Sequence, residues 1–298
     1  MRNTFILELC KAARVNEKIV LIIADLGYNV VEPFQEEFPD RFFNLGISEQ
    51  AIASAAAGLA SQGLKVFVYS IGNFPTFRCA EQIRNDISYH NLDVTIVSVG
   101  GGLSYGNLGY SHHAIQDFGL MRLFPEMDIL APIDPSTTSS CLEYAINTDG
   151  PKYLRLRKAG EKNFKIENKV DENWQYVSGN LTSKEIILTT GAAIQTGMKE
   201  YFDQNYPNHA VYISLLWGQK YKSQTKKLIS KFDQIICYED HICAGGFGSF
   251  ILECSKPIDR EKIKLYNIAN SIIGMVGKED YLIQKAIEKY CSLSAKFS

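Results

Sequence analysis

The stretch "IVLIIAD" at residues 19–25 is an uninterrupted aliphatic run that ends at a carboxylate. A run of this length and composition predicts a strand buried on both faces. Similar runs recur at "KVFVYS" (65–70), "DVTIVSVG" (93–100), "MDILAP" (127–132) and "KYLRL" (152–156). Helical patterns separate these runs, so the first half of the chain is expected to form a parallel sheet covered by helices on both faces.

The alternation stops at residues 160–183, where charges, Asn and Gly predict a linker. It then resumes with the apolar runs "EIILTTG" (185–191), "AVYISLL" (210–216), "DQIICYED" (233–240) and "KIKLYNI" (262–268). We therefore predict an α/β fold with two doubly wound parallel-sheet domains. The first domain is expected at 1–160, the linker at 161–183, and a smaller second domain at 184–298.

Composition excludes several classes of protein. Thirty-one Lys and Arg residues face 33 Asp and Glu residues, and no basic tract is present, so nucleic-acid binding is not expected. The first residues contain only a short apolar turn, which predicts neither a signal peptide nor a membrane anchor. Seven cysteines without a C-x-x-C pair predict reduced, mostly buried thiols and a cytoplasmic location.

One carboxylate stands at the start of a helix made of small apolar residues. The segment "FFNLGISEQAIASAAAGLASQG" (42–63) places Glu49 directly after Ser48, a predicted N-cap. A glutamate in a first helical turn ordinarily interacts only with the helix dipole. Here, however, the neighbours expected to surround the carboxyl group are Leu45, Ile47, Ala51 and Ile52. Apolar surroundings favour a protonated carboxyl group, which could donate a hydrogen bond.

A glycine-rich loop, "GGGLSYGNLGYSHHAIQD" (100–117), follows a predicted strand and therefore belongs at the carboxyl edge of the sheet. Ligands of open α/β sheets bind at this edge, and glycines allow the backbone to approach a ligand closely. The loop contains two candidate functional residues, His112 and His113. Neither has the spacing of a metal ligand, and the chain contains no dinucleotide fingerprint, P-loop or nucleophile elbow.

Several segments occur together in one order along the chain. They are "GISEQ" (46–50), "RCAEQIRND" (78–86), "GNLGYSHHAIQD" (106–117), "MRLFPEMDILAPIDP" (121–135), "GPKYLRLRK" (150–158), "TTGAAIQTG" (189–197) and "YEDHICAGGFGS" (238–249). The chain resembles the C-terminal half of a transketolase over essentially its whole length. The resemblance implies a pyrimidine-binding domain for thiamine diphosphate, followed by the C-terminal domain of the family.

The resemblance also implies roles at the cofactor. The glutamate of the matching helix start, here Glu49, would hydrogen-bond N1′ of the cofactor's aminopyrimidine ring and so activate the cofactor. The aromatic residue that stacks on this ring falls at Phe74 or Phe77, with Phe74 preferred, and Arg78 follows as a further cofactor contact.

Substrate contacts follow from the same resemblance. His112 would face the reacting carbon, while Arg157 and Arg2 would bind the far end of the substrate. Ordinary transketolases carry polar sugar-phosphate contacts where this chain has Gly100 and Leu108. The resemblance therefore predicts weak specificity for the usual sugar phosphates and favours a modified sugar as substrate.

A motif of the family is missing. Complete transketolases bind Mg²⁺ and diphosphate through G-D-G followed by Asn, and this chain lacks that motif. The resemblance therefore implies that an N-terminal partner subunit supplies it, in an α2β2 assembly with the cofactor at the interface. No metal ligand is expected in this chain, and Mg²⁺ would be held mainly by the partner.

Three functions are compatible with these features. The first is ketol transfer between sugars by one subunit of a split transketolase-like enzyme. The second is the β subunit of a thiamine diphosphate-dependent 2-oxoacid dehydrogenase, or a related decarboxylating or synthase enzyme. The third is a non-catalytic α/β scaffold, in which Glu49 is only a helix-dipole partner.

Overall fold

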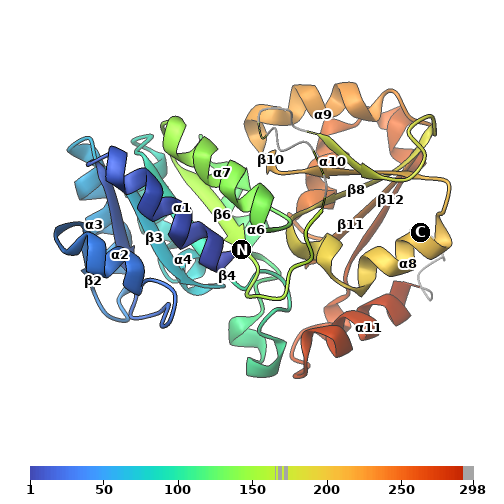
Figure 1. Cartoon of the computed structure of the whole chain (residues 1–298). Helices are drawn as coiled ribbons and strands as arrows, with labels where there is room; N and C mark the ends of the chain where they lie inside the picture. Colours follow the sequence, from blue (N-terminus) through green and yellow to red (C-terminus); the bar gives the residue numbers. More distant parts are fainter. Residues whose placement is uncertain (165, 167–169, 171–173, 291–298) are drawn as a thin grey trace.

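Two sheets, one in each half of the chain, organise the protein (Figure 1). The computed structural model describes residues 1–164, 166, 170 and 174–290. The first sheet has the order β10-β5-β6-β4-β3-β1-β2. Its strands are β1 (Ile19–Ile23), β2 (Phe42–Asn44), β3 (Lys65–Ile71), β4 (Val94–Val99), β5 (Asp128–Leu130), β6 (Lys152–Leu156) and β10 (Leu216–Trp217). Strands β1 to β6 are parallel, so their carboxyl ends share one edge.

The second sheet has the order β12-β11-β8-β9-β7. Its strands are β7 (Gln175–Ser178), β8 (Glu185–Thr190), β9 (Ala210–Ser214), β11 (Gln234–Ile242) and β12 (Ile263–Ile268). The predicted fold class is confirmed, although each sheet carries one antiparallel edge strand. Strand β7 lies in the range expected to be a linker, and β10 crosses from the second half of the chain to pair with β5.

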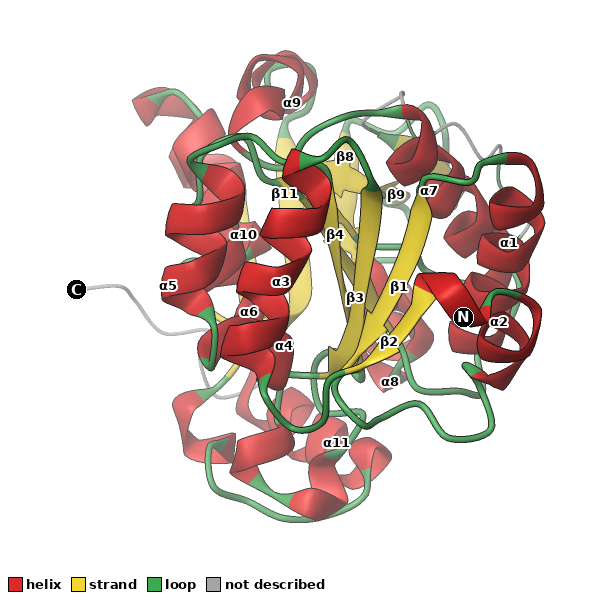
Figure 2. Ribbon diagram, turned by 90° about the vertical axis from the view of Figure 1, so that its left-hand side faces the viewer, coloured by secondary structure: helices red, strands yellow, loops and turns green. Residues whose placement is uncertain are grey.

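Helices cover both faces of the first sheet, as its continuous apolar strands require. Figure 2 shows α1 (Arg2–Val15), α2 (Glu32–Glu37) and α7 (Pro135–Asn147) on one face, and α3 (Glu49–Ser61), α4 (Phe74–Phe77) and α5 (Ala80–Gln82) on the other. The remaining helices are α6 (Asp117–Met121), α8 (Gly197–Asn205), α9 (Lys222–Ile229), α10 (Phe247–Cys254) and α11 (Glu279–Tyr290). Within the described residues, no helix is long and apolar enough to span a membrane.

The helical segment between β3 and β4 is broken into three pieces. Cys79, at φ −125°, leaves the helical region and separates α4 from α5. A π-helical turn, Ile83–Ser88, continues from α5. Phe74 is the first residue of α4 and Arg78 follows its last residue, so both lie close in sequence to the carboxyl end of β3.

A buried charge network joins the two halves of the chain. Arg155 on β6 donates from Nε to Asp117 Oδ2 over 2.8 Å and from Nη1 to Asp240 Oδ1 over 2.6 Å. Asp117 begins α6, and Asp240 lies on β11 of the second sheet. The Tyr153 hydroxyl also donates to Asp117 Oδ2, over 2.5 Å. All four side chains are buried, so each charge depends on its partners rather than on water.

Replacing Arg155 by methionine should strongly destabilise the protein, because two buried carboxylates would lose their cation. We expect Arg155→Met to lower the free energy of unfolding by about 3–5 kcal/mol, measured by urea denaturation. The matched control is Arg14→Met, which removes an exposed arginine paired with Glu37 and should change stability little. Equal stability of Arg155→Met and the wild type would contradict a structural role for the network.

Candidate active site

The predicted site residues follow the carboxyl ends of four parallel strands. Glu49 comes after β2, Phe74 and Arg78 after β3, the loop with His112 after β4, and Arg157 after β6. Because these strand ends share one edge of the first sheet, segments far apart in the sequence become neighbours there.

Glu49 is the first residue of α3 and is only 5% exposed. Its Oε1 accepts a hydrogen bond from Arg78 Nη1 over 2.8 Å. The apolar enclosure expected from the sequence is incomplete, because Leu45 and Ile47 are exposed, as is Ala51, and only Ile52 is buried. The carboxylate is therefore accompanied by a cation in this chain, where the sequence had predicted apolar contacts.

The turn in front of Glu49 is held by side-chain hydrogen bonds. Ser48 occupies the N-cap position, but its hydroxyl donates to the Leu45 carbonyl and does not cap the helix. Asn44 donates to Asp25 Oδ1 over 3.0 Å, and its side-chain oxygen accepts from the backbone N–H groups of Asp25 and Gly46. These bonds tie the turn to the end of β1.

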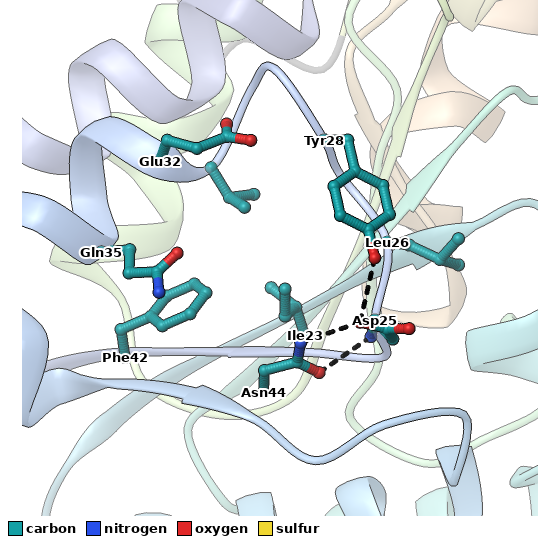
Figure 3. Close-up of a pocket in the computed structure, with 9 residues that line it drawn as sticks. Ile23, Asp25, Leu26, Tyr28, Glu32, Gln35, Phe42 and Asn44 are labelled. Atoms are coloured by element: carbon teal, nitrogen blue, oxygen red, sulfur yellow. Dashed lines mark hydrogen bonds between the residues drawn. The ribbon is translucent and has the colours of Figure 1, made fainter.

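A small cavity adjoins this turn (Figure 3), where Asp25, Asn44 and Tyr28 gather beside β1. Its volume is about 90 Å³. Ordinary ligand pockets measure roughly 300–1,000 Å³. The cavity is therefore too small for a cofactor, and Glu49 does not line it.

The other predicted cofactor residues contact one another. The Arg78 guanidinium carbon lies 3.9 Å from the centre of the Phe74 ring, and this ring lies 5.1 Å from the His112 ring. Glu49, Arg78, Phe74 and His112 thus form one connected group. Phe77 is 46% exposed, and within the described part of the chain no aromatic or cation–π contact links it to this group.

The two adjacent histidines have different environments. His113 is fully buried, and its Nε2 lies 3.3 Å from the Gly106 carbonyl oxygen, so it packs inside the loop. His112 is partly exposed, with Nδ1 3.0 Å from Ser111 Oγ. Partial burial, together with the neighbouring His113 and Arg78, lowers the pKa of His112 below its usual value. Its imidazole is therefore neutral at neutral pH.

The two arginines predicted to bind the far end of the substrate, Arg157 and Arg2, have different surroundings. Arg157 Nη2 donates to Glu279 Oε2 over 2.5 Å, so its charge is paired with α11 of the second domain. Burial raises the pKa values of Tyr69 and Tyr105, and the positive charge of Arg2, on α1, partly opposes this rise. Lys158 follows Arg157 and lies 4.8 Å above the Tyr105 ring. Neither Lys158 nor Tyr105 was predicted from the sequence.

Gly100, Gly101 and Gly102 were expected to let the loop backbone approach a ligand, but the structure gives them another role. A Cβ atom on Gly100 would overlap the Tyr105 ring, one on Gly101 would overlap Arg155, and one on Gly102 would overlap Asp240. The glycines therefore make room for side chains of this chain rather than for a ligand. The run of three glycines was the sequence signal of this close packing. Leu108, the other position without the expected polar contact, is 51% exposed.

No cluster of three or more His, Cys, Asp or Glu side chains suited to a metal ion occurs within the described residues.

Six cysteines are described, and all six are free thiols, as predicted: Cys10, Cys79, Cys141, Cys237, Cys243 and Cys254. The seventh, Cys291, lies outside the described residues.

Comparisons with known proteins identify relatives of this chain. Residues 1–160 match the family model described as "Transketolase, pyrimidine binding domain". The chain is 29% identical to a Methanocaldococcus jannaschii protein named "Putative transketolase C-terminal section", over 95% of this chain and 90% of the relative. It is 30% identical to an apulose-4-phosphate transketolase subunit of Phocaeicola vulgatus, over 85% and 82% of the two chains.

A 1-deoxy-D-xylulose-5-phosphate synthase of Clostridium perfringens is 31% identical over 94% of this chain, but the match spans only 46% of that enzyme. Among solved structures, one described as "Split gene transketolase, inactive beta4 tetramer" has a TM-score of 0.75 and 24% identity, and covers 99% of this chain and 98% of its own. This structure supports the same fold. Together, the domain match and the relatives show that the chain belongs to the transketolase family.

Proposed function

We propose that this chain is the C-terminal subunit of a split enzyme that transfers a two-carbon ketol unit between sugars. The observation that carries the proposal is the buried carboxylate of Glu49, grouped with Phe74 and His112 at the carboxyl edge of the first sheet. The relatives named as a transketolase C-terminal section and as one subunit of a transketolase support a separate polypeptide. The six free thiols support a reducing, cytoplasmic location.

The residues present fit thiamine diphosphate. Glu49 offers a carboxyl group that is nearly excluded from water, which suits a hydrogen bond to a ring nitrogen. Phe74 offers an aromatic face beside it, and its contact with the Arg78–Glu49 pair favours Phe74 over Phe77 as the stacking residue. When bound, the cofactor supplies the nucleophilic carbon and the electron sink for breaking a carbon–carbon bond of a ketose.

Arg78 covers both of the groups that the aminopyrimidine ring would use. Its guanidinium pairs with Glu49 and stacks on Phe74, yet its side chain is 45% exposed. An exposed arginine on a short helical segment can move toward solvent at small cost. In place of the direct cofactor contact expected from the sequence, we propose that Arg78 leaves Glu49 and the Phe74 face when the ring binds, so that Glu49 can hold a proton at N1′.

His112 is the candidate for proton transfer on the substrate. Its lowered pKa keeps the imidazole neutral, so it can accept a proton from a sugar hydroxyl at neutral pH. Ser111 lies at hydrogen-bond distance from Nδ1 and can fix the ring so that Nε2 is the accepting atom.

The partner subunit is expected to carry the G-D-G…N motif and to hold Mg²⁺ with the diphosphate, in an α2β2 complex. Large apolar side chains are exposed near the Glu49 end of the sheet edge, among them Leu45, Ile47 and Phe77. Exposed apolar groups beside a buried carboxylate support closure of the site by another polypeptide.

The main alternative keeps the cofactor and changes the reaction. A β subunit of a 2-oxoacid dehydrogenase, or a synthase related to the deoxyxylulose phosphate enzymes that match this chain, would decarboxylate its substrate. Release of CO₂ from a 2-oxoacid by the assembled complex would favour this alternative. A non-catalytic scaffold has less support, because Glu49 is grouped with an aromatic residue and a histidine rather than facing solvent.

Substitution of Glu49 by glutamine tests the assignment of the activating residue. Glutamine keeps the size of the side chain, so the variant should fold normally. It cannot share a proton with N1′, so activation of the cofactor should be slow. Deuterium exchange at C2 of the cofactor in the assembled complex, followed by proton NMR, should slow at least roughly 100-fold. The matched control is Glu81→Gln on the exposed side of α5, which should exchange like the wild type. Normal exchange in Glu49→Gln would refute the assignment.

The split site predicts that cofactor binding depends on the partner. Titration calorimetry with thiamine diphosphate and Mg²⁺ should detect weak binding by this chain alone and tight binding by the assembled complex. The reason is that the diphosphate and metal ligands are expected on the other polypeptide. Tight, magnesium-dependent binding by this chain alone would contradict a shared site.

The usual transketolase donor and acceptor, xylulose 5-phosphate and ribose 5-phosphate, should be poor substrates of the complex. Gly100 and Leu108 provide no polar side chain, so the site loses the discrimination that buried hydrogen-bonding groups give. Steady-state kinetics of the complex with xylulose 5-phosphate and ribose 5-phosphate should give a specificity constant below about 10⁴ M⁻¹s⁻¹. Apulose 4-phosphate, named in a relative, is the comparison donor and is expected to react faster. Efficient turnover of the ordinary pair would show that other residues replaced the missing contacts.

A further inference from the structure

The glycine-rich loop is supported from the second half of the chain by the segment 276–282, which includes the start of α11 (Figure 1). The Gly277 N–H group donates to the Gly106 carbonyl oxygen over 3.2 Å. A Cβ atom on Gly106 would lie 2.5 Å from Leu282 Cδ1 and 2.7 Å from the Gly277 carbonyl oxygen. The loop and the segment therefore approach each other backbone to backbone, at a distance that only a glycine permits.

The Gly106 carbonyl oxygen also links this contact to the paired histidines. It lies 3.3 Å from Nε2 of His113, the neighbour of His112. A carbonyl oxygen only accepts hydrogen bonds, so Nε2 of His113 carries the proton. His113 is fully buried, and its own carbonyl oxygen accepts from the Asn73 side chain over 2.6 Å. The backbone beside His112 is thus held from both halves of the chain.

Glu279, the first residue of α11, ties the segment 276–282 to the first sheet. Its Oε2 accepts from Nη2 of Arg157, the residue after β6, over 2.5 Å. The side chains are only 17% and 11% exposed, so this charge-assisted pair is stronger than an ordinary surface ion pair. The other carboxylate oxygen of Glu279 lies 3.3 Å from Ser104 Oγ in the loop. One carboxylate therefore connects α11, the edge of the first sheet and the glycine-rich loop.

We propose that Glu279 is a positioning residue for His112. Paired with Arg157, it fixes the segment 276–282 against the first sheet, and this segment in turn holds the loop through Gly106. The inference rests on the proposed function, because it concerns the histidine assigned to proton transfer on the substrate. It gives the second half of the chain a part in that step, although the four residues grouped around Glu49 all belong to the first half.

This arrangement separates two steps of the proposed reaction. Glu49 begins α3 and follows β2, so its position depends on elements other than the segment 276–282. Loss of the support at Glu279 should therefore impair proton transfer on the substrate while activation of the cofactor proceeds normally. A variant that only loosens the whole chain would slow both steps. Measuring both steps in one variant distinguishes positioning from general stability.

Glu279→Ala removes the anchor of the segment. In the assembled complex, with apulose 4-phosphate as donor and ribose 5-phosphate as acceptor, kcat should fall roughly 100-fold, the usual cost of a misplaced catalytic group. Deuterium exchange at C2 of the cofactor should keep the wild-type rate. Glu279→Gln retains a hydrogen bond to Arg157 and should recover most of the activity. The matched control is Asp280→Ala, at the next and exposed residue of α11, which should behave like the wild type.

A second variant separates the loop from Arg157. Gly106→Ala leaves the pair between Arg157 and Glu279 intact, but its methyl group forces the loop away from Gly277. It should reproduce the low kcat and the normal C2 exchange of Glu279→Ala. If Glu279 acts only by restraining Arg157, Glu279→Ala would change KM rather than kcat, and Gly106→Ala would react like the wild type. That result would overturn the inference.

Hydrogen exchange of the full chain, without partner or cofactor, tests the support directly. Amide exchange in peptides covering residues 103–113, measured by mass spectrometry, should accelerate roughly tenfold in Glu279→Ala, as loss of one charge-assisted hydrogen bond predicts. Asp280→Ala should leave this exchange unchanged. If circular dichroism shows that Glu279→Ala does not fold, Gly106→Ala carries the same measurements.

The outcomes separate this inference from the proposed function. Faster loop exchange in Glu279→Ala, with a wild-type complex that transfers no ketol unit, would reject the proposed function and support the role of Glu279 in holding the loop. Unchanged loop exchange in Glu279→Ala would overturn the inference. An equal slowing of C2 exchange and ketol transfer would also overturn it, because it would show a general structural role.

Discussion

Arg155 carries a positive charge in the protein interior, and its two carboxylate partners come from different halves of the chain. Asp117 belongs to the end of the glycine-rich loop, and Asp240 belongs to the second sheet. Because a buried charge without a partner costs several kcal/mol, the three groups must stay together. The loop that carries His112 is consequently anchored at its far end, and the second domain is held against the carboxyl edge of the first sheet.

The same constraint explains the sequence of the loop. Arg155 and Asp240 pack so closely against Gly101 and Gly102 that neither position has room for a side chain, and Tyr105 imposes the same condition on Gly100. The loop thus uses its glycines for internal packing. This packing leaves the Tyr105 ring beside His112 and Lys158.

Sequence patterns predicted the architecture well, because each central strand is an apolar run buried on both faces. They also predicted which segments meet, since residues that follow parallel strands share one edge of a sheet. The partners of individual side chains were not predictable. The Arg78–Glu49 and Arg157–Glu279 pairs join residues 29 and 122 positions apart, and no local pattern encodes such contacts. The edge strands β2, β7 and β10 were missed because they are short and pair through tertiary contacts.

The environment of Glu49 links these observations to the proposed assembly. A carboxylate that is 5% exposed needs either a cation or a hydrogen-bonded neutral partner. In this chain Arg78 supplies the cation, while Leu45 and Ile47 remain exposed and provide no apolar cover. In the proposed complex, the partner would cover these apolar residues, and the aminopyrimidine ring would replace the arginine. Arg78 would then stabilise this chain ahead of assembly, and its exposed position lets it give way without disturbing α3.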